Sequence, residues 1–319
     1  MTRKLYFRWN SIFRQRSLSM KNKTKTISLV LGSGGARGYA HIGVIEELLK
    51  HGYDIRSVSG SSMGALIGGL YACGKLDAYK EWVLGLDLID VAKLVDFSFT
   101  GTGIIQGEKV FDVINEMVGD VYIEELPIPF TAVATDLLRQ KEVWLQKGKL
   151  IDAIRASIAI PTIFTPKKIG ERYLIDGGVL NPLPIAPTIA DDTQLTIAVN
   201  LSANISKKYQ IDVPRKEQEK ASGMQEVFFQ MAKKAEELFA REKTDRFDEM
   251  DMFDIMGRTI DIMQHAIMES KMAGYAPDMI IGVPNNACGF YEFNKAYELI
   301  ELGRLIAREH LEENRDETV

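Results

Sequence analysis

A serine framed by glycines is the first feature of the sequence that could carry chemistry. The run Gly60-Ser61-Ser62-Met63-Gly64 fits the pattern G-x-S-x-G, in which the serine projects from a sharp, strained turn between a strand and a helix. Residues two before and two after such a serine crowd the turn, so only small ones fit. The following helix would direct its N-terminus at a developing oxyanion. Ser62 is therefore the candidate nucleophile, although a structural glycine turn would leave the same pattern.

A glycine-rich loop, Gly-Ser-Gly-Gly-Ala-Arg-Gly, covers residues 32–38. Consecutive glycines let several backbone N–H groups point at one spot, which holds an oxyanion in an acyl hydrolase and a phosphate in a nucleotide-binding protein. The nucleotide interpretation is disfavoured because the next strand ends in Val58-Ser59-Gly60, without the acid of a Rossmann site. Gly38 is also followed by Tyr39-Ala40, where a P-loop has lysine and a hydroxyl residue. A loop that only permits close packing is the third interpretation.

An acid followed by two glycines, Asp176-Gly177-Gly178, comes directly after the apolar run 173–175. An aspartate at a strand end can serve as a base, whereas an ordinary turn aspartate is the alternative. Histidine is the usual base for a serine nucleophile. None of the four histidines lies in a motif of its own: His41, His51, His265 and His310. Asp176 is therefore the better candidate base.

Short apolar segments alternate with amphipathic ones around these motifs, which predicts an α/β fold with a central, mostly parallel sheet and helices on both faces. Strands are expected at 26–31, 55–59, 130–134, 142–145, 173–175, 195–200 and 279–283. Helices are expected after the glycine loop, after Ser62, and near 76–95, 107–118, 149–157, 251–273 and 294–312. The glycine loop and Ser62 each follow a strand, where the sheet of such a fold carries its site.

The domain organisation is expected to be simple. We interpret residues 26–312 as one α/β domain, with a charged helical insertion or lid at about 204–275 and a short tail at 313–319. Residues 1–25 contain eight basic residues, no acid and interleaved aromatics. We favour a disordered tail for them over a membrane-surface arm.

Composition excludes several classes of function. The net charge of -5 argues against nucleic acid as a partner. Two cysteines and four histidines without ligand spacing give no sign of a disulfide framework or a metal site, so no metal and no cofactor is expected. No apolar run has the length of a signal peptide or a membrane span, so we expect a cytoplasmic protein with, at most, peripheral contact to the inner face of the membrane. The oligomeric state is left open.

Together the motifs resemble the patatin-like phospholipase family, and in particular its bacterial branch related to neuropathy target esterase. The stretches that carry the resemblance are LVLGSGGARGYAHIGV (29–44), SGSSMGALIGGLYACG (59–74), VATDL (133–137), IRASIAIPTIFTP (154–166) and YLIDGGVLNPLP (173–184). They occur in the order of the family and span most of 26–200. The sequence departs from the family pattern at two positions, Ser33 and Thr162, where relatives often have glycine. Neither departure affects the assignment of the proposed reacting groups.

The resemblance implies a patatin-like three-layer α/β/α fold and a two-residue catalytic dyad. Ser62 matches the nucleophile of the family and Asp176 its proton acceptor, while Gly34 and Gly35 match the backbone donors of the oxyanion hole. Arg37 matches an arginine that contacts an anionic head group or, alternatively, forms a buried structural ion pair. The expected substrate is a phospholipid, a lysophospholipid or a simple fatty-acyl ester.

The expected reaction is hydrolysis through an acyl-enzyme. Asp176 accepts the proton of Ser62, and burial of this carboxyl group near 173–175 is expected to raise its pKa above the ordinary value of about 3.9. Two rivals remain at this level. One is an acyltransferase that uses the same acyl-enzyme, and the other is a non-catalytic lipid-binding protein on the same scaffold.

Overall fold

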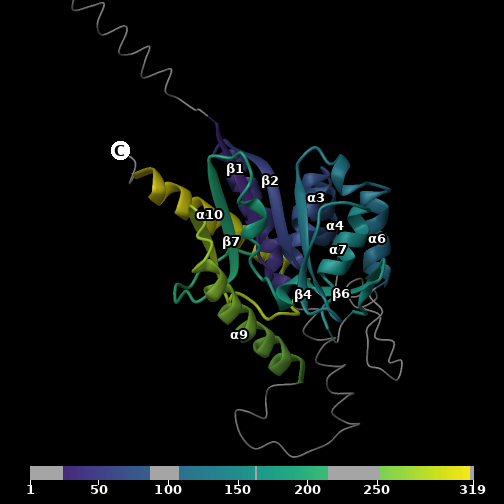
Figure 1. Cartoon of the computed structure of the whole chain (residues 1–319). Helices are drawn as coiled ribbons and strands as arrows, with labels where there is room; N and C mark the ends of the chain where they lie inside the picture. The colour runs from purple at the N-terminus through teal and green to yellow at the C-terminus, as the bar shows by residue number, and fades with distance from the viewer. Residues whose placement is uncertain (1–23, 87–107, 162–163, 215–251, 317–319) are drawn as a thin grey trace, which may run out of the picture.

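The computed structural model describes residues 24–86, 108–161, 164–214 and 252–316 (Figure 1). Its strands are β1 (Lys25–Leu31), β2 (Tyr53–Ser61), β3 (Phe130–Asp136), β4 (Lys141–Leu145), β5 (Lys167–Ile169), β6 (Arg172–Asp176), β7 (Leu195–Ala203) and β8 (Met279–Pro284). Its α-helices are α2 (Ala40–Lys50), α3 (Met63–Ala72), α4 (Leu76–Gly85), α6 (Glu108–Val118), α7 (Leu150–Ser157), α9 (Met252–Met272) and α10 (Ala296–Asp316). Short 3-10 turns include η1 (Gly35–Tyr39), η2 (Ile123–Glu125), η3 (Gly177–Val179) and η4 (Ala186–Thr188).

These strands form a single mixed sheet that is parallel at its centre. Strand pairing runs in the order β5-β6-β3-β2-β1-β7-β8, and β4 also pairs with β3. The pairs β3–β2, β2–β1, β1–β7 and β7–β8 are parallel, whereas β4 and β6 run antiparallel to β3 and β5 runs antiparallel to β6. The predicted α/β class with a mostly parallel sheet is thereby confirmed.

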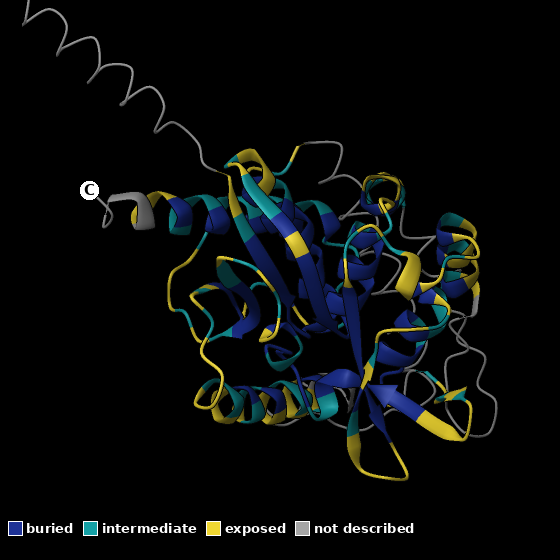
Figure 2. Cartoon of the chain, turned by 45° about the horizontal axis from the view of Figure 1, so that its top comes forward, coloured by how far each residue is buried: buried dark blue, intermediate teal, exposed yellow. Residues whose placement is uncertain are grey.

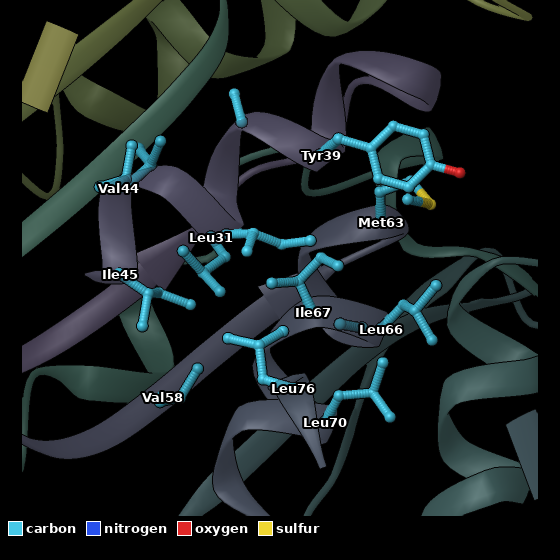
Figure 3. Packing of buried hydrophobic residues seen from close by; sticks show 14 of the residues in the cluster. Leu31, Tyr39, Val44, Ile45, Val58, Met63, Leu66, Ile67, Leu70 and Leu76 are labelled. Atoms are coloured by element: carbon cyan, nitrogen blue, oxygen red, sulfur yellow. The ribbon is translucent and has the colours of Figure 1, made fainter. Parts of the chain in front are cut away.

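The central strand β1 has buried side chains on both of its faces, as expected for a strand inside a parallel sheet. Ile27, Leu29 and Leu31 belong to the large core that also contains residues of α2, α3, α7 and α10. Figure 3 shows Leu31 and Val58 from the sheet packed against side chains of α2 and α3. Val30 faces the other way into a smaller cluster that includes Met268 of α9. Helices therefore cover both faces, and the buried cluster on the side of α2 and α3 is the larger of the two.

Strand β3 brings two distant parts of the chain together along one edge. β4 pairs with Ala132–Asp136 of β3, so it occupies one edge of β3 along these residues. β2 pairs with residues up to Val133, and β6 pairs with residues from Ala134 onward. Because each strand edge binds one partner at a time, β2 and β6 must share the opposite edge. They meet there end to end.

The predicted segments agree with the described elements, with some differences. The helix expected near 76–95 is described as α4, which ends at Gly85, and residues 87–95, like Thr162, lie outside the described residues. The hairpin strand β5 was not predicted, because three residues are too short to show periodicity. The helix expected at 251–273 is α9. Residues 215–251 lie outside the described part, so the insertion or lid at 204–275 stays a prediction.

Candidate active site

Ser62 lies at the turn between β2 and α3, in a backbone conformation that non-glycine residues rarely adopt. Its φ is 54° and its ψ is -125°. A Cβ atom on Gly60 would lie 2.3 Å from the carbonyl oxygen of Gly64, and one on Gly64 would lie 2.0 Å from that of Leu31. A side chain at position 60 or 64 would clash with the backbone, so both positions of the motif must be glycine. This strained turn presents the Ser62 side chain at the end of β2.

A second serine fixes the backbone of this turn. The Ser157 hydroxyl, buried at the end of α7, accepts a hydrogen bond from the Ser62 N–H at 2.9 Å and donates one to the Val133 carbonyl at 2.6 Å. Ser157 thus ties the turn to strand β3. Ser157 was not a candidate from the sequence. The only signal was its position within the resembling stretch 154–166.

Asp176 lies within hydrogen-bonding distance of Ser62, as the end-to-end arrangement of β2 and β6 requires. The Ser62 Oγ donates to the Asp176 Oδ2 at 2.6 Å, and the Gly178 N–H donates to Oδ1 at 2.7 Å. A Cβ atom on Gly177 would lie 2.1 Å from the Val133 carbonyl oxygen, so the chain after Asp176 must be glycine. The carboxylate is held by one donor on each oxygen.

Burial changes the acidity of this carboxyl group. Asp176 is 3% exposed, and desolvation raises its pKa from the ordinary value to about 7. The hydrogen bonds from Ser62 and Gly178 lower the pKa but only partly offset the desolvation. A carboxylate with a pKa near neutrality is a much better base than an ordinary surface aspartate.

The glycine loop lies against both reacting groups. A Cβ atom on Gly38 would lie 2.4 Å from the side chain of Met63, the residue after Ser62, and one on Gly178 would lie 2.6 Å from the Ser33 hydroxyl. The amides of the loop divide into two kinds. Those of Gly32, Ser33 and Ala36 donate to the carbonyls of Val199, Pro182 and Phe290 respectively. Within the described residues, no backbone partner is recorded for the amides of Gly34 and Gly35.

Arg37 forms a buried ion pair, the second of the two alternatives that the sequence left open. It is 1% exposed, and its guanidinium donates to both carboxylate oxygens of Asp261 on α9, at 2.5 and 3.2 Å. A further bond at 2.7 Å goes to the Asn285 carbonyl. These contacts engage Arg37 in holding the loop.

A second polar contact joins α9 to the loop. Gln264, one turn after Asp261 and 5% exposed, donates from Nε2 to the Ser33 hydroxyl at 3.1 Å. The same nitrogen lies 2.3 Å from the position of a Cβ atom on Gly178, so the side chain packs between the loop and the turn after Asp176. Neither Asp261 nor Gln264 was a candidate from sequence. Their spacing of three marks a helix face but does not identify its partner.

His41 contacts the start of the glycine loop and takes no part in the Ser62–Asp176 contact. Its Nε2 lies 2.8 Å from the Gly32 carbonyl oxygen, and burial lowers its pKa to about 4. The ring is therefore neutral near pH 7 and donates to that carbonyl. Over the described ranges, no histidine is recorded as a hydrogen-bond partner of Ser62 or Asp176, and no group of three His, Cys, Asp or Glu residues could hold a metal ion.

Two cavities lie away from the reacting groups. One of about 240 Å³ is lined by residues at the start of β3, with Ser57 and Asp191 beside them. Another of about 320 Å³ lies between residues 207–211 and α10. Neither is lined by Ser62 or Asp176. The hydrogen-bond geometry, and not cavity size, therefore identifies the candidate site.

Comparisons with a family model and with known proteins indicate the same family. A family model described as patatin-like phospholipase matches residues 29–189, which include the glycine loop, Ser62 and Asp176. An uncharacterised NTE family protein of Mycobacterium tuberculosis is 39% identical over 328 aligned positions, which cover 90% of this chain and 91% of the relative. Neuropathy target esterase of Drosophila pseudoobscura pseudoobscura is 31% identical over 204 positions, covering 57% of this chain and 14% of that protein.

Among solved structures, VipD from Legionella pneumophila aligns with 91% of this chain and 67% of its own, at a TM-score of 0.42 and 15% sequence identity. Within the described residues, no helix combines the length and the apolar character needed to cross a bilayer.

Proposed function

The chain belongs to the patatin-like phospholipase family, whose members are lipid hydrolases, and from this premise we propose that it is a serine acyl hydrolase acting through Ser62 and Asp176. The observation that carries the proposal is the 2.6 Å hydrogen bond from the Ser62 hydroxyl to the Asp176 carboxylate. A hydroxyl at a strained turn, bonded to a buried carboxylate, is the pairing expected of a nucleophile and its base.

In the first half of the reaction, the Ser62 oxygen attacks the carbonyl carbon of an acyl ester. Its proton passes to the Asp176 Oδ2, to which it is already bonded. The oxyanion of the tetrahedral intermediate accepts from the amides of Gly34 and Gly35, which have no recorded partner among the described residues. The alcohol then leaves with the proton from Asp176, and an acyl-enzyme remains on Ser62.

In the second half, the ionised Asp176 removes a proton from a water molecule that attacks the acyl-enzyme. The same amides hold the second oxyanion, and the proton returns to Ser62 as the fatty acid leaves. The Asp176 carboxyl group thus acts as base and then as acid in both halves of the reaction. A pKa of about 7 suits this double task, because the group is neither a very weak base nor a very weak acid near neutral pH.

The proposed substrates are fatty-acyl esters of lipids, including phospholipids and lysophospholipids. Family membership supports the lipid class, and the site itself supports the ester. The described residues hold Arg37 in an ion pair with Asp261, so they provide no reason to prefer an anionic head group at that position. The head group and the acyl-chain length are therefore matters for a substrate panel.

The test is active-site labelling followed by that panel. We expect a fluorophosphonate probe to label the full chain and a Ser61→Ala variant, but not Ser62→Ala. Ser61 is the matched control, because it is a buried neighbour whose hydroxyl has no recorded hydrogen bond among the described residues. Release of fatty acid from phosphatidylcholine, lysophosphatidylcholine and p-nitrophenyl butyrate should follow the labelling. Equal labelling of Ser62→Ala would refute the assignment.

A further inference from the structure

Two β-hairpins extend past the end of the sheet where Ser62 and Asp176 meet. The turn between β3 and β4 lies beside the hairpin of β5 and β6, because the Leu137 N–H donates to the Tyr173 carbonyl at 2.9 Å. Figure 1 places β4 and β6 at the lower end of the sheet, and in Figure 2 exposed turns project from this end. Both hairpins thus belong to the edge of the molecule that carries the candidate site.

Strand register gives the depth of the reacting groups below these turns. Asp176 pairs with Ala134, and Leu138 lies four residues farther along the chain. At about 3.3 Å per residue, the turn stands roughly 13 Å beyond the row of Asp176. Tyr173, three residues before Asp176, stands roughly 10 Å beyond it. A flat surface resting on the hairpins would therefore lie above the site, at a height that one lipid molecule can bridge.

The hairpin turn exposes two leucines in a fixed backbone. Leu137 is 46% exposed and Leu138 is 69% exposed. The Asp136 Oδ1 accepts from the amides of Leu138 at 3.2 Å and Arg139 at 3.0 Å, and the Gln140 N–H donates to the Asp136 carbonyl at 2.8 Å. The exposure of the leucines is therefore built into a hydrogen-bonded turn. Neighbouring Tyr173 adds a ring that is 42% exposed.

Unpaired positive charge surrounds these apolar side chains. Lys141, Lys168 and Arg172 are exposed, and no acidic partner is recorded for them among the described residues. The Lys168 ammonium lies 5.6 Å from the Tyr173 ring centroid. Other charged side chains of the hairpins are paired: Arg139 with Asp136, Lys167 with Asp152, and Glu142 with Lys271. Glu171 is the one exposed acid of the hairpins without a recorded partner in this part of the structure.

We propose that this hairpin surface, made of Leu137, Leu138, Lys141, Lys168, Arg172 and Tyr173, docks the protein on an anionic lipid bilayer. The leucines enter the interface and the ring lies at head-group level, while the three cations face anionic head groups. The local excess of positive charge contrasts with the net charge of -5 of the whole chain, so a negative surface is favoured at this edge. The proposal deepens the proposed function, since it explains how the site meets lipid in a bilayer.

The experiment measures binding separately from hydrolysis. The full chain carrying Ser62→Ala is sedimented with vesicles of phosphatidylcholine, or of phosphatidylcholine and phosphatidylglycerol at about 7:3. We expect tighter binding to the anionic vesicles. Leu137→Asp with Leu138→Asp should weaken it at least tenfold. Lys141→Glu, Lys168→Glu and Arg172→Glu together should lower the preference for phosphatidylglycerol by on the order of a hundredfold, since each basic residue near such a surface contributes about fivefold.

Matched controls keep the rest of the chain, including its basic residues 1–25, unchanged. Ile189→Asp alters another exposed apolar side chain, which is 59% exposed and lies in the 180–194 segment. Lys75→Glu, Lys147→Glu and Lys208→Glu together make the same charge change on exposed residues outside the hairpins. Both controls should bind more tightly than the corresponding hairpin variants.

Several outcomes would overturn the proposal. One is equal binding of the hairpin variants and their controls. Another is absence of any preference for anionic vesicles in the parent protein. A third is a dimer that the leucine variants convert to monomer, since the surface would then bind a second copy. If the parent binds through the hairpins but the chain with Ser62 intact hydrolyses no ester, docking stands and the proposed function fails.

Discussion

The two halves of the candidate site are held in different ways. Ser62 and Asp176 are positioned by the sheet itself, because β2 and β6 end on the same edge of β3 and the Ser157 hydroxyl ties the turn to that strand. The glycine loop is held partly by side chains of α9, through the Arg37–Asp261 ion pair and the Ser33–Gln264 contact. The proposed nucleophile and base thus depend on backbone architecture, whereas the glycine loop proposed to stabilise the oxyanion depends on a helix more than 220 residues away.

Removal of either reacting group should give the largest effect. Ser62→Ala and Asp176→Asn should each lower kcat for p-nitrophenyl butyrate on the order of 10⁴-fold. The double variant should lose little more than either single one, because the two groups act as a unit. Steady-state kinetics measure these losses, with near-ultraviolet circular dichroism to confirm folding and Ser61→Ala as the control. Losses that multiply in the double variant would contradict a dyad.

The stability of the fold should depend on the charge of Asp176. Its folded-state pKa is raised to about 7, above the unfolded value, so ionisation costs folding free energy as pH rises from about 4 to 7. Asp176→Asn removes this cost. It should raise the free energy of unfolding at pH 8 by on the order of 3 kcal/mol and change it little at pH 4. Urea titrations at the two pH values provide the measurement; a variant destabilised equally at both would contradict the buried carboxyl.

The same ionisation should govern activity. The base must be deprotonated, so kcat should fall tenfold for each pH unit below about 7 and reach about a hundredfold loss at pH 5. His41, with its pKa lowered to about 4, should add no step in this range. A pH profile from 5 to 9 measures the midpoint, and His41→Gln is the control. A midpoint near pH 4, typical of an exposed aspartate, would contradict the burial of the Asp176 carboxyl group.

The part of the site that contains Ser62 and Asp176 was largely predictable from sequence. A glycine on each side of Ser62 and an acid before two glycines are local consequences of a crowded turn, so the pattern carries the geometry. The contacts of α9 were not predictable, because Asp261 and Gln264 look like any polar residues on an amphipathic helix. Their partners Arg37 and Ser33 become visible only when the helix is placed against the loop.

The arrangement of the strands shows the same limit. Alternating elements predicted a mostly parallel sheet, and the structure agrees. They did not predict that β6 runs antiparallel and meets β2 end to end on β3. Pairing partners are set by tertiary packing, and a five-residue segment carries no sign of its direction. The family resemblance could therefore pair Ser62 with Asp176, but the sequence did not show by which strand arrangement the two side chains meet.

Disruption of the Arg37–Asp261 ion pair should displace the glycine loop and leave the Ser62–Asp176 contact unchanged. Asp261→Asn leaves a guanidinium that is 1% exposed without its counter-charge. We expect a loss of roughly 2–3 kcal/mol of stability, below that of a fully buried pair because Asp261 is 23% exposed. kcat should fall about tenfold or more through displacement of the loop amides, with KM little changed. Asp261→Glu should restore part of kcat, whereas a loss of stability alone would indicate a purely structural pair.

The smallest effect is expected at Gln264, whose role is to position the loop through a neutral contact. Gln264→Leu removes the bond to the Ser33 hydroxyl, but it also removes a buried Oε1 that has no recorded partner among the described residues. The two changes oppose each other, so the free energy of unfolding should move by no more than about 1 kcal/mol. If the contact aligns the loop, kcat should still fall several-fold while the rate of Ser62 labelling by a small sulfonyl fluoride stays closer to the parent value. Ser157→Ala is the counterpart on the other half of the site, and it should slow labelling and turnover together. Identical responses from the two variants would remove the distinction between a half held by the sheet and a half held by α9.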